Sequence, residues 1–161
     1  MEGSKSLTPQ VVVKDLLLRV KDQAYYIGES AKSDPRLVEI SAKIQASDDD
    51  DPILKDFVSD ATSVVCNLLS RMLGETSYSN EGENITFTIK AAANTPDLQD
   101  QLVDYITNYM STSILRNWLN TVKSDEAKRF DEKLIRLETE LIQLSARYIF
   151  RSIPVHFPAA Y

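Results

Sequence analysis

Apolar residues recur along most of this chain at intervals of three and four positions, the spacing that places them on one face of an α-helix. The pattern predicts five helices, at about residues 9–27, 35–45, 52–73, 96–122 and 125–150. The last range keeps alternating steps of three and four residues for three heptads, which is typical of a helix that packs along another helix. The chain is therefore expected to be mainly α, a five-helix bundle.

Local signals for helix ends agree with these ranges. Proline at the first helical position lacks only a donor that would be unused there, and a preceding Thr or Asp can cap the first turn. Gly28 and Gly74 are expected to end the first and third helices. The predicted starts are Thr8-Pro9, Asp34-Pro35, Asp51-Pro52, Thr95-Pro96 and Ser124-Asp125-Glu126.

The period changes to two between about residues 75 and 90. Ile85, Phe87 and Ile89 alternate with polar residues, which predicts a half-buried strand. Residues 76–79 are expected to pair with it across residues 80–83, giving a small β-hairpin insertion. Because a lone hairpin is only marginally stable, a helix of the same chain or another subunit should cover it.

The organisation that follows is a single helical domain, residues 1–152, with an extended C-terminal tail, residues 153–161. No linker is long enough to separate two domains. Pro154 cannot continue the last helix. No apolar run reaches membrane length, so no membrane segment is expected.

Composition narrows the chemistry available to the 161 residues. A single cysteine, Cys66, and a single histidine, His156, exclude an intrachain disulfide, a Cys/His zinc site and a centre of several histidines. The chain also lacks GxGxxG, Walker A and HExxH motifs. We therefore expect no enzyme activity, no cofactor and no metal site.

Charge is distributed unevenly along the chain, whose formal net charge is -6. Residues 1–28 carry 4 basic and 3 acidic groups, residues 29–108 carry 6 and 15, and residues 109–161 carry 8 and 6. This balance does not suit non-specific nucleic-acid binding, which depends on clustered Lys and Arg. If the acidic middle and the basic C-terminal region lie on opposite sides, copies could meet head to tail in a closed ring. Alternatively, both regions are simply hydrated.

The most conspicuous charge run is Asp48, Asp49, Asp50 and Asp51. Carboxylates in series can bind a cation, but the run lacks the alternating ligands, central Gly and terminal Glu of an EF-hand loop. It passes directly into Pro52 and an apolar helix. We interpret it as a solvated acidic surface that caps a helix, with contact to a cation or a basic partner as the alternative.

Two segments are candidate partner-binding surfaces. The first is the tail, whose prolines restrict its unfolded conformations, so that it could dock on a groove or add to a sheet edge at reduced entropic cost. The second is the hairpin, whose open edge could pair with another chain. The alternatives are a tail that packs on its own bundle or is disordered, and a hairpin covered by a local helix. The partner-binding candidates are Ile85, Phe87, Ile89, Ile153, Val155, His156, Phe157 and Tyr161.

Residues 48–61, continuing through Val64, Val65 and Leu68, resemble the signature helix of tailed-bacteriophage head–tail connector proteins, the neck or adaptor family. In that family an acidic turn precedes a helix with paired apolar positions and a small residue. The long helix at residues 105–119 and the basic helix at residues 128–151 are also similar to the connector pattern. The short helix at residues 35–45 and the hairpin depart from it.

The resemblance implies a non-enzymatic virion protein that is made in the host cytoplasm and located in the neck of the particle. Such a protein forms a homo-oligomeric ring on the portal, contacts portal and tail or neck proteins, and joins the capsid to the tail. DNA passes through the lumen of the ring without specific binding, and an acidic lumen would favour this passage.

Two other functions remain open from the sequence. A cytoplasmic acidic helical chaperone or protein-binding adaptor would hold a peptide in an apolar groove between the helices at residues 96–122 and 125–150. A helical-bundle enzyme would use clustered carboxylates, and it requires a pocket with several acids whose ionisation is perturbed.

Overall fold

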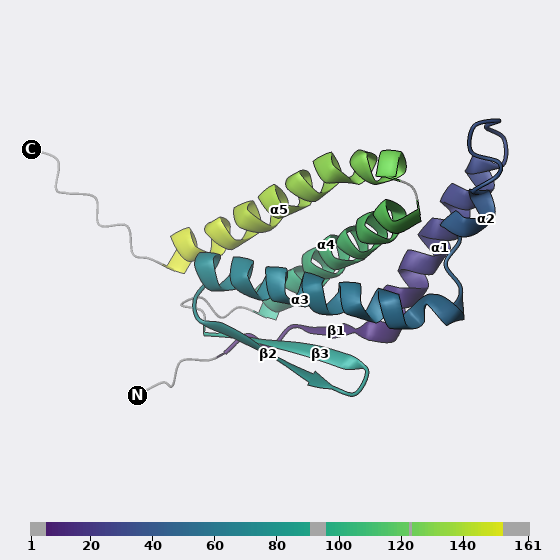
Figure 1. Ribbon diagram of the computed structural model, residues 1–161. Helices are drawn as coiled ribbons and strands as arrows, with labels where there is room; N and C mark the ends of the chain where they lie inside the picture. Colours follow the sequence, from purple (N-terminus) through teal and green to yellow (C-terminus); the bar gives the residue numbers. More distant parts are fainter. Residues whose placement is uncertain (1–5, 91–95, 123, 153–161) are drawn as a thin grey trace, which may run out of the picture.

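The computed structural model describes residues 6–90, 96–122 and 124–152 (Figure 1). It confirms a mainly helical protein with a small β-hairpin, and the hairpin belongs to a three-stranded antiparallel sheet. The helices are α1 (Val13–Ala31), α2 (Ser41–Ile44), α3 (Asp51–Met72), α4 (Pro96–Val122) and α5 (Ser124–Ser152), with a 3-10 turn at Asp48–Asp50 before α3. The strands are β1 (Gln10–Val12), β2 (Thr76–Glu81) and β3 (Asn84–Ile89).

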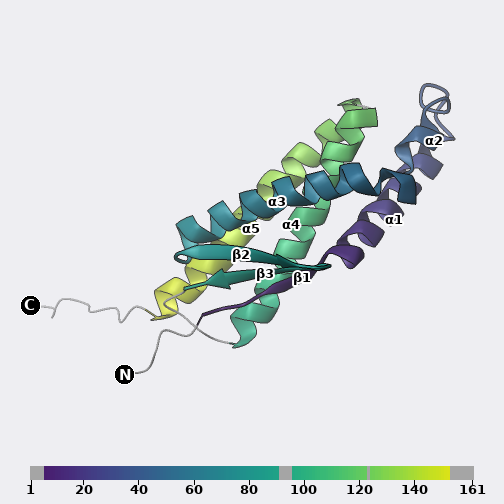
Figure 2. The ribbon, with the colours of Figure 1, turned by 60° about the horizontal axis from the view of Figure 1, so that its bottom comes forward.

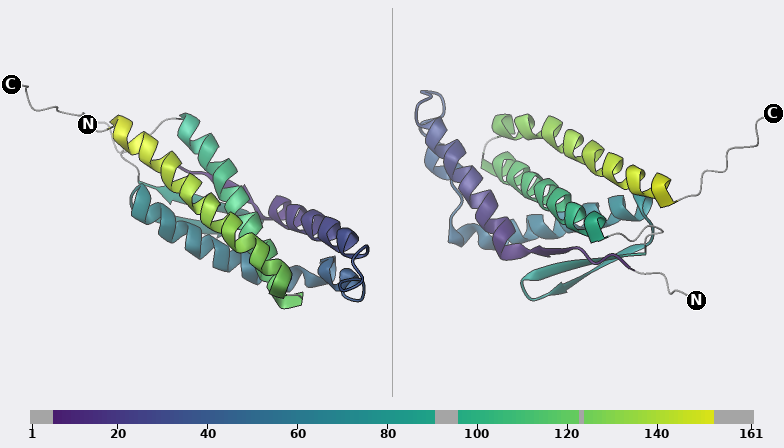
Figure 3. Two further views of the ribbon diagram at one scale, coloured as in Figure 1. Left: turned by 90° about the horizontal axis from the view of Figure 1, so that it is seen from above. Right: turned by 180° about the vertical axis from the view of Figure 1, so that it is seen from behind.

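Helix α4 occupies the centre of the molecule. Helices α1, α3 and α5 all pack against it, and Figure 2 shows α3 crossing α4 while α1 and α5 lie on different sides of it. The sheet lies on the side of α3 and α4 that faces away from α5 (Figure 3). Since α4 meets so many neighbours, its buried residues are spread around its circumference. They include Leu102, Ile106, Met110 and Leu119, all of which are fully buried.

The sheet has the strand order β1-β3-β2, so β3 is its central strand. Phe87 lies opposite Tyr78 of β2, and Val11 of β1 lies opposite Ile85. Alternate residues of β3 are buried, as its period of two predicts. Among the described residues β2 pairs only with β3, so it forms one edge of this sheet.

The predicted start of the first helix at Pro9 is wrong, because this part of the chain joins the sheet. The N–H of Leu7 donates to the carbonyl of Ile89 over 2.9 Å, and the N–H of Phe87 donates to the carbonyl of Pro9 over 3.0 Å. Helix α1 begins only at Val13. Pairing with a distant strand therefore outweighs the local Thr-Pro signal, which by itself is only a weak preference.

The predicted end of the first helix at Gly28 is also wrong, since α1 continues to Ala31 and buries Gly28 in its last part. The predicted helix at residues 35–45 is shorter than expected and is limited to Ser41–Ile44. Before it, Leu37 and Ile40 donate to the carbonyls three residues earlier, at Asp34 and Leu37. These bonds close turns rather than a regular α-helix.

The predictions for the three long helices are confirmed within two residues at each end. Each combines an apolar face with a local start signal, and α3 has proline in its first turn. Strands β2 and β3 also lie where the sequence places the hairpin. The predicted tail, residues 153–161, lies outside the described residues.

Candidate functional site

The apolar residues of the hairpin belong to the core and not to a binding surface. Ile85, Phe87 and Ile89 have no exposed surface. They lie on the face of the sheet that α3 and the other helices cover. These side chains are therefore not available to a partner in this fold, and a local helix provides the cover that the hairpin requires.

The open edge that the sequence assigned to the hairpin belongs to β2. The backbone groups of Phe87 and Ile89 point toward the β1 side, where they bond to Pro9 and Leu7. In an antiparallel pair, residues that exchange hydrogen bonds alternate with residues that do not. Tyr78, opposite Phe87, and Asn80, opposite Ile85, are therefore residues whose N–H and C=O point away from β3.

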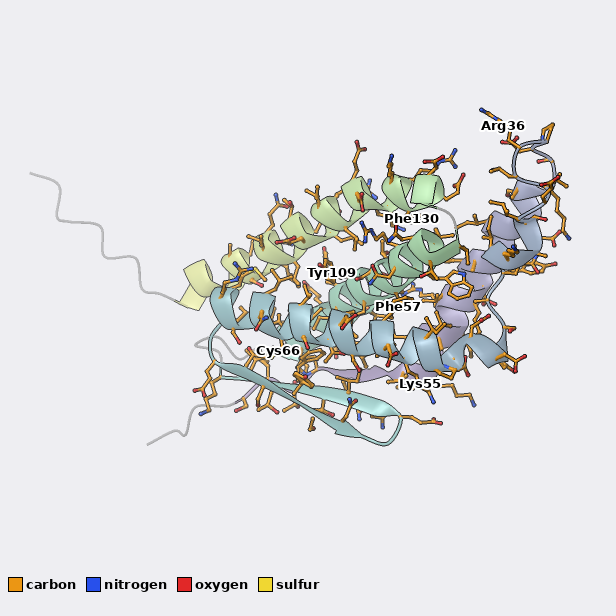
Figure 4. All side chains as sticks on the ribbon, viewed as in Figure 1. Arg36, Lys55, Phe57, Cys66, Tyr109 and Phe130 are labelled. Carbon is orange, nitrogen blue, oxygen red and sulfur yellow. The ribbon has the colours of Figure 1, made fainter. Side chains whose placement is uncertain are left out.

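Helix α3 satisfies the outward-pointing groups at the start of β2. The N–H of Thr76 donates to Ser70 Oγ over 3.2 Å, and the thiol of Cys66 donates to the carbonyl of Thr76 over 3.3 Å. Figure 4 shows Cys66 on the side of α3 that faces the sheet. No hydrogen bond within the described part of the chain reaches the N–H or C=O of Tyr78 or Asn80. The free edge is thus confined to the second half of β2.

The side chain of Tyr78 lies on the same face of the sheet as Phe87, and the two ring centroids are 6.3 Å apart. Phe87 is fully buried, whereas Tyr78 is 44% exposed. The core-side face of the sheet is therefore left incompletely covered at this edge.

A groove lies beside the end of β2 that leads into the β2–β3 turn. It lies between the first half of α1, the first half of α3 and the β2–β3 turn, with a volume of about 640 Å³. Its apolar side is formed by Val13, Leu17, Leu18 and Val58. Gly82 of the turn and polar and charged residues, including Lys55 on α3 (Figure 4), complete its lining; the polar and charged residues are Lys14, Lys21, Asp48, Asp51, Lys55, Ser59, Asn80 and Glu83.

The acidic run at residues 48–51 closes one end of this groove and has a structural role. Ser47 and Asp50 form a capping box, in which Asp50 Oδ2 accepts from the N–H of Ser47 over 2.7 Å. Lys21 Nζ lies 2.9 Å from Asp48 Oδ1 and 2.6 Å from Asp51 Oδ1. These contacts support the interpretation of the run as a capping loop, here anchored to α1 by Lys21.

The ionisation of this pair follows from its contacts. The hydrogen bond and charge of Lys21 lower the pKa of Asp48. Partial burial lowers the pKa of Lys21, but the hydrogen bonds and charges of Asp51 and Asp48 outweigh it and leave the pKa raised. Both groups are therefore held in their charged forms, whereas a general acid needs a carboxyl whose pKa is raised. Among the described residues, no cluster of three or more Asp, Glu, Cys or His side chains is placed to hold a metal ion.

Sequence reasoning missed apolar residues that the helices expose. On α1, Leu18, Tyr25 and Tyr26 are at least half exposed, and the two tyrosine rings meet edge to face at 5.9 Å. On α5, Ile135 is 67% exposed, and Ile142, one heptad later, is also exposed. Their positions outside the apolar stripe of each helix are the sequence signal that could have found them.

The remaining candidates are placed as follows. Ile153, Val155, His156, Phe157 and Tyr161 lie outside the described residues. The groove expected between α4 and α5 is instead a packed interface. Residues of α5 that are buried in it include Leu137, Leu141 and Leu144. None of the helices in the described ranges is both long enough and apolar enough to span a bilayer.

Comparisons of this chain with protein-family models, curated proteins and solved structures find no match.

Proposed function

We propose that this chain is a structural protein of a tailed-phage virion, a head–tail connector that assembles as a ring on the portal and joins the capsid to the tail. In this role it has no catalytic site. It is made in the host cytoplasm and becomes part of the neck. The resemblance of residues 48–68 to connector proteins supports the proposal from the sequence.

The open edge of β2 is the structural observation that carries this proposal. Within the described part of the chain, no hydrogen bond reaches the N–H or C=O of Tyr78 or Asn80, which point away from β3. Such an edge is a template for pairing with another chain, and soluble monomers usually block it. A subunit of an assembly can bind another chain through such an edge, whereas a monomeric protein must protect it.

A ring subunit also needs two different surfaces, because neighbouring copies in a ring meet head to tail. The exposed apolar residues of α1 and α5 lie on helices that flank α4 on different sides, which suits this requirement (Figure 2). The acidic turn before α3 and the C-terminal end of α5 lie at opposite ends of the molecule (Figure 1). This separation suits contact between the ends of adjacent copies, although Lys21 neutralises part of the acidic turn.

The test of this function is assembly on a portal ring. The gene is expected to lie beside portal, terminase and capsid genes, and the purified chain should form a closed ring when mixed with the neighbouring portal protein. Electron microscopy and light scattering of the mixture would show the ring and its mass. A chain that stays unbound to that portal, or a gene with no virion genes near it, would contradict the proposal.

A protein-binding adaptor is the alternative function, and the groove beside the hairpin favours it. The apolar side formed by Val13, Leu17 and Val58 could hold apolar side chains of a peptide. Substituting the half-exposed Leu18 with Asp should then abolish peptide capture without placing a charge in the core, to which Leu17 and Val58 belong. The connector proposal predicts that a portal ring is bound and that no free peptide is needed.

A further inference from the structure

We propose that the open edge of β2 binds residues 153–161 of a second copy of this chain as an added antiparallel strand. This interaction deepens the proposed assembly function and rests on it for the presence of the second copy. The receiving groups are the N–H and C=O of Tyr78 and Asn80, which point away from β3. Together they offer two donors and two acceptors to an incoming strand.

The order of residues in the segment fits an edge strand. In a strand, the backbone groups of successive residues point to opposite sides, so only every second residue can bond to β2. Pro154 and Pro158 are four residues apart and fall in the same alternate set. If that set faces solvent, neither proline removes a hydrogen bond to β2, which is the position that a sheet tolerates for proline. The bonding set is then Ile153, Val155, Phe157, Ala159 and Tyr161.

The direction of the added strand follows from where its side chains would lie. In an antiparallel pair, residues that bond to each other lie directly opposite and share one face of the sheet. The bonding set would then share the face of Tyr78, the incompletely covered core side. A parallel strand would turn the same residues to the outer face. Only the antiparallel arrangement therefore directs Pro154 and Pro158 away from β2 and also places Ile153, Val155 and Phe157 on the core side of the sheet.

The length of the segment indicates that a second copy supplies it. Helix α5 ends at the same end of the molecule as α3, where β2 begins (Figure 1). To run antiparallel to β2, the chain's own segment would first have to pass along the whole strand to the hairpin turn. Six residues of β2 span about 20 Å, and nine residues reach at most about 30 Å. Ile153, Val155 and Phe157 would then be used up in reaching the turn and could not pair with Tyr78 and Asn80, whereas the segment of a neighbouring copy can enter from the turn.

The groove beside the hairpin would receive the first part of this strand. An antiparallel segment passes the β2–β3 turn before it reaches Asn80 and Tyr78, and Asn80 lines the groove. Ile153 would thus lie against the apolar side formed by Leu17, Leu18 and Val58. The groove and the open edge would then be parts of one binding surface.

Disulfide formation between two copies tests the proposal. One full-length copy carries Tyr78→Cys, and the other carries Val155→Cys, His156→Cys or Phe157→Cys, all in a Cys66→Ser background. With a mild oxidant, positions 155 and 157 should form the mixed dimer several-fold more than position 156. Ser79→Cys, whose side chain is on the outer face, is the matched control and should prefer position 156. Preference of Tyr78→Cys for position 156, or no mixed dimer at any position, would overturn the proposal.

Single proline substitutions in the segment provide an independent test. In full-length protein, Val155→Pro removes an N–H that faces β2, whereas His156→Pro removes one that faces solvent. By sedimentation, Val155→Pro should raise the dissociation constant of self-association by about tenfold, as expected for a lost hydrogen bond and an unpaired acceptor, with His156→Pro close to the unsubstituted chain. Equal effects of the two substitutions would contradict strand addition.

The source of the strand and the larger function are tested separately. A diluted chain that carries both Tyr78→Cys and Phe157→Cys should form little intramolecular disulfide, and efficient internal closure would show that each copy binds its own segment. If a ring still forms on the portal without intermolecular disulfides, strand addition is wrong and the connector function stands. If the intermolecular disulfides form but no ring is found on the portal, strand addition stands and the connector function is wrong.

Discussion

The indole Nε1 of Trp118, on α4, donates a hydrogen bond to the main-chain carbonyl of Ile44, the last residue of α2, over 2.7 Å. Both residues are buried, and they are 74 positions apart in the sequence. This bond joins the four-residue α2 to the central helix. Since α2 is too short to be stable by itself, contacts of this kind determine its position.

Substitution of Trp118 with Phe should therefore destabilise the protein. Phenylalanine keeps an aromatic ring in the site but leaves the carbonyl of Ile44 without its donor. An unsatisfied buried acceptor costs about 1–3 kcal/mol. The free energy of unfolding, measured by urea denaturation and circular dichroism, should fall by that amount. Tyr25→Phe, at an exposed aromatic residue, is the control and should change it little.

At Gly28, α1 lies close to the segment around α2. A Cβ at this position would lie 2.8 Å from the carbonyl oxygen of Ser41 and 2.7 Å from Cγ of Gln45. The side chain of Gln45 can move, but the backbone of Ser41 cannot move without shifting α2. Gly28→Ala should thus lower the melting temperature and cost about 1–3 kcal/mol, as overpacking does. Ser30→Ala, on the exposed side of the same helix, should be nearly neutral.

The contacts of Lys21 with the acidic turn predict how stability depends on pH. The folded-state pKa of Asp48 is below its ordinary value of 3.8, so its contribution is present above that pH and is lost as the pH falls through the lower folded value. The pKa of Lys21 is raised above 10.5, so its contribution is present below that pH and is lost as the pH rises through the higher folded value.

Lys21→Met should accordingly reduce stability at neutral pH and flatten its dependence on pH in both windows. Urea denaturation at a series of pH values measures this. Lys14→Met, at a second lysine of the same groove, is the matched control. Identical pH profiles for the Lys21→Met protein and the unsubstituted protein would show that the acidic turn does not depend on Lys21.

The thiol of Cys66 should react slowly in the folded protein. Burial raises its pKa above the ordinary value of 9.0, although a hydrogen bond with Ser70 opposes the shift. A raised pKa leaves less thiolate, which is the reactive form. The rate with a thiol reagent at mildly alkaline pH should be several-fold lower than in the denatured chain. Equal rates would mean that α3 does not shield this side chain from solvent.

Phe87 provides a test of whether the hairpin belongs to the core. Phe87→Ala should cost about 3–5 kcal/mol, as the loss of a buried aromatic side chain usually does. Tyr78→Ala, on the opposite strand and 44% exposed, should cost much less. Denaturation of the two variants compares them directly. If Phe87→Ala were as stable as the unsubstituted protein, Phe87 would not be part of the core, and it would again be a candidate for partner binding.

The long helices and the hairpin could be predicted because their signals are local. In α5, the steps between Phe130, Leu134, Leu137 and Leu141 already define the buried stripe. In β3, the alternation of Ile85, Phe87 and Ile89 with threonines defines a strand with one buried face. Neither pattern depends on what the element packs against.

The parts that sequence analysis missed depend on distant partners. The start of the first helix was misplaced because Leu7 and Pro9 bond to Ile89 and Phe87, in a strand far along the chain. The length of the second helix was overestimated because hydrogen-bonded turns, and not an α-helix, occupy most of the predicted range after Asp34. The roles of Lys21 and Trp118 also require contacts between segments far apart in the chain.

By itself, the sequence determined that the chain is mainly helical and where the three long helices and the two strands of the hairpin lie. Only the tertiary structure decided that β1 takes one side of β3, that helices cover the hairpin, and that no described segment pairs with the Tyr78 and Asn80 edge of β2. The physical reason is that the spacing of apolar residues is a local property of the sequence. Hydrogen-bond partners across a sheet depend instead on which distant segments meet in the folded chain.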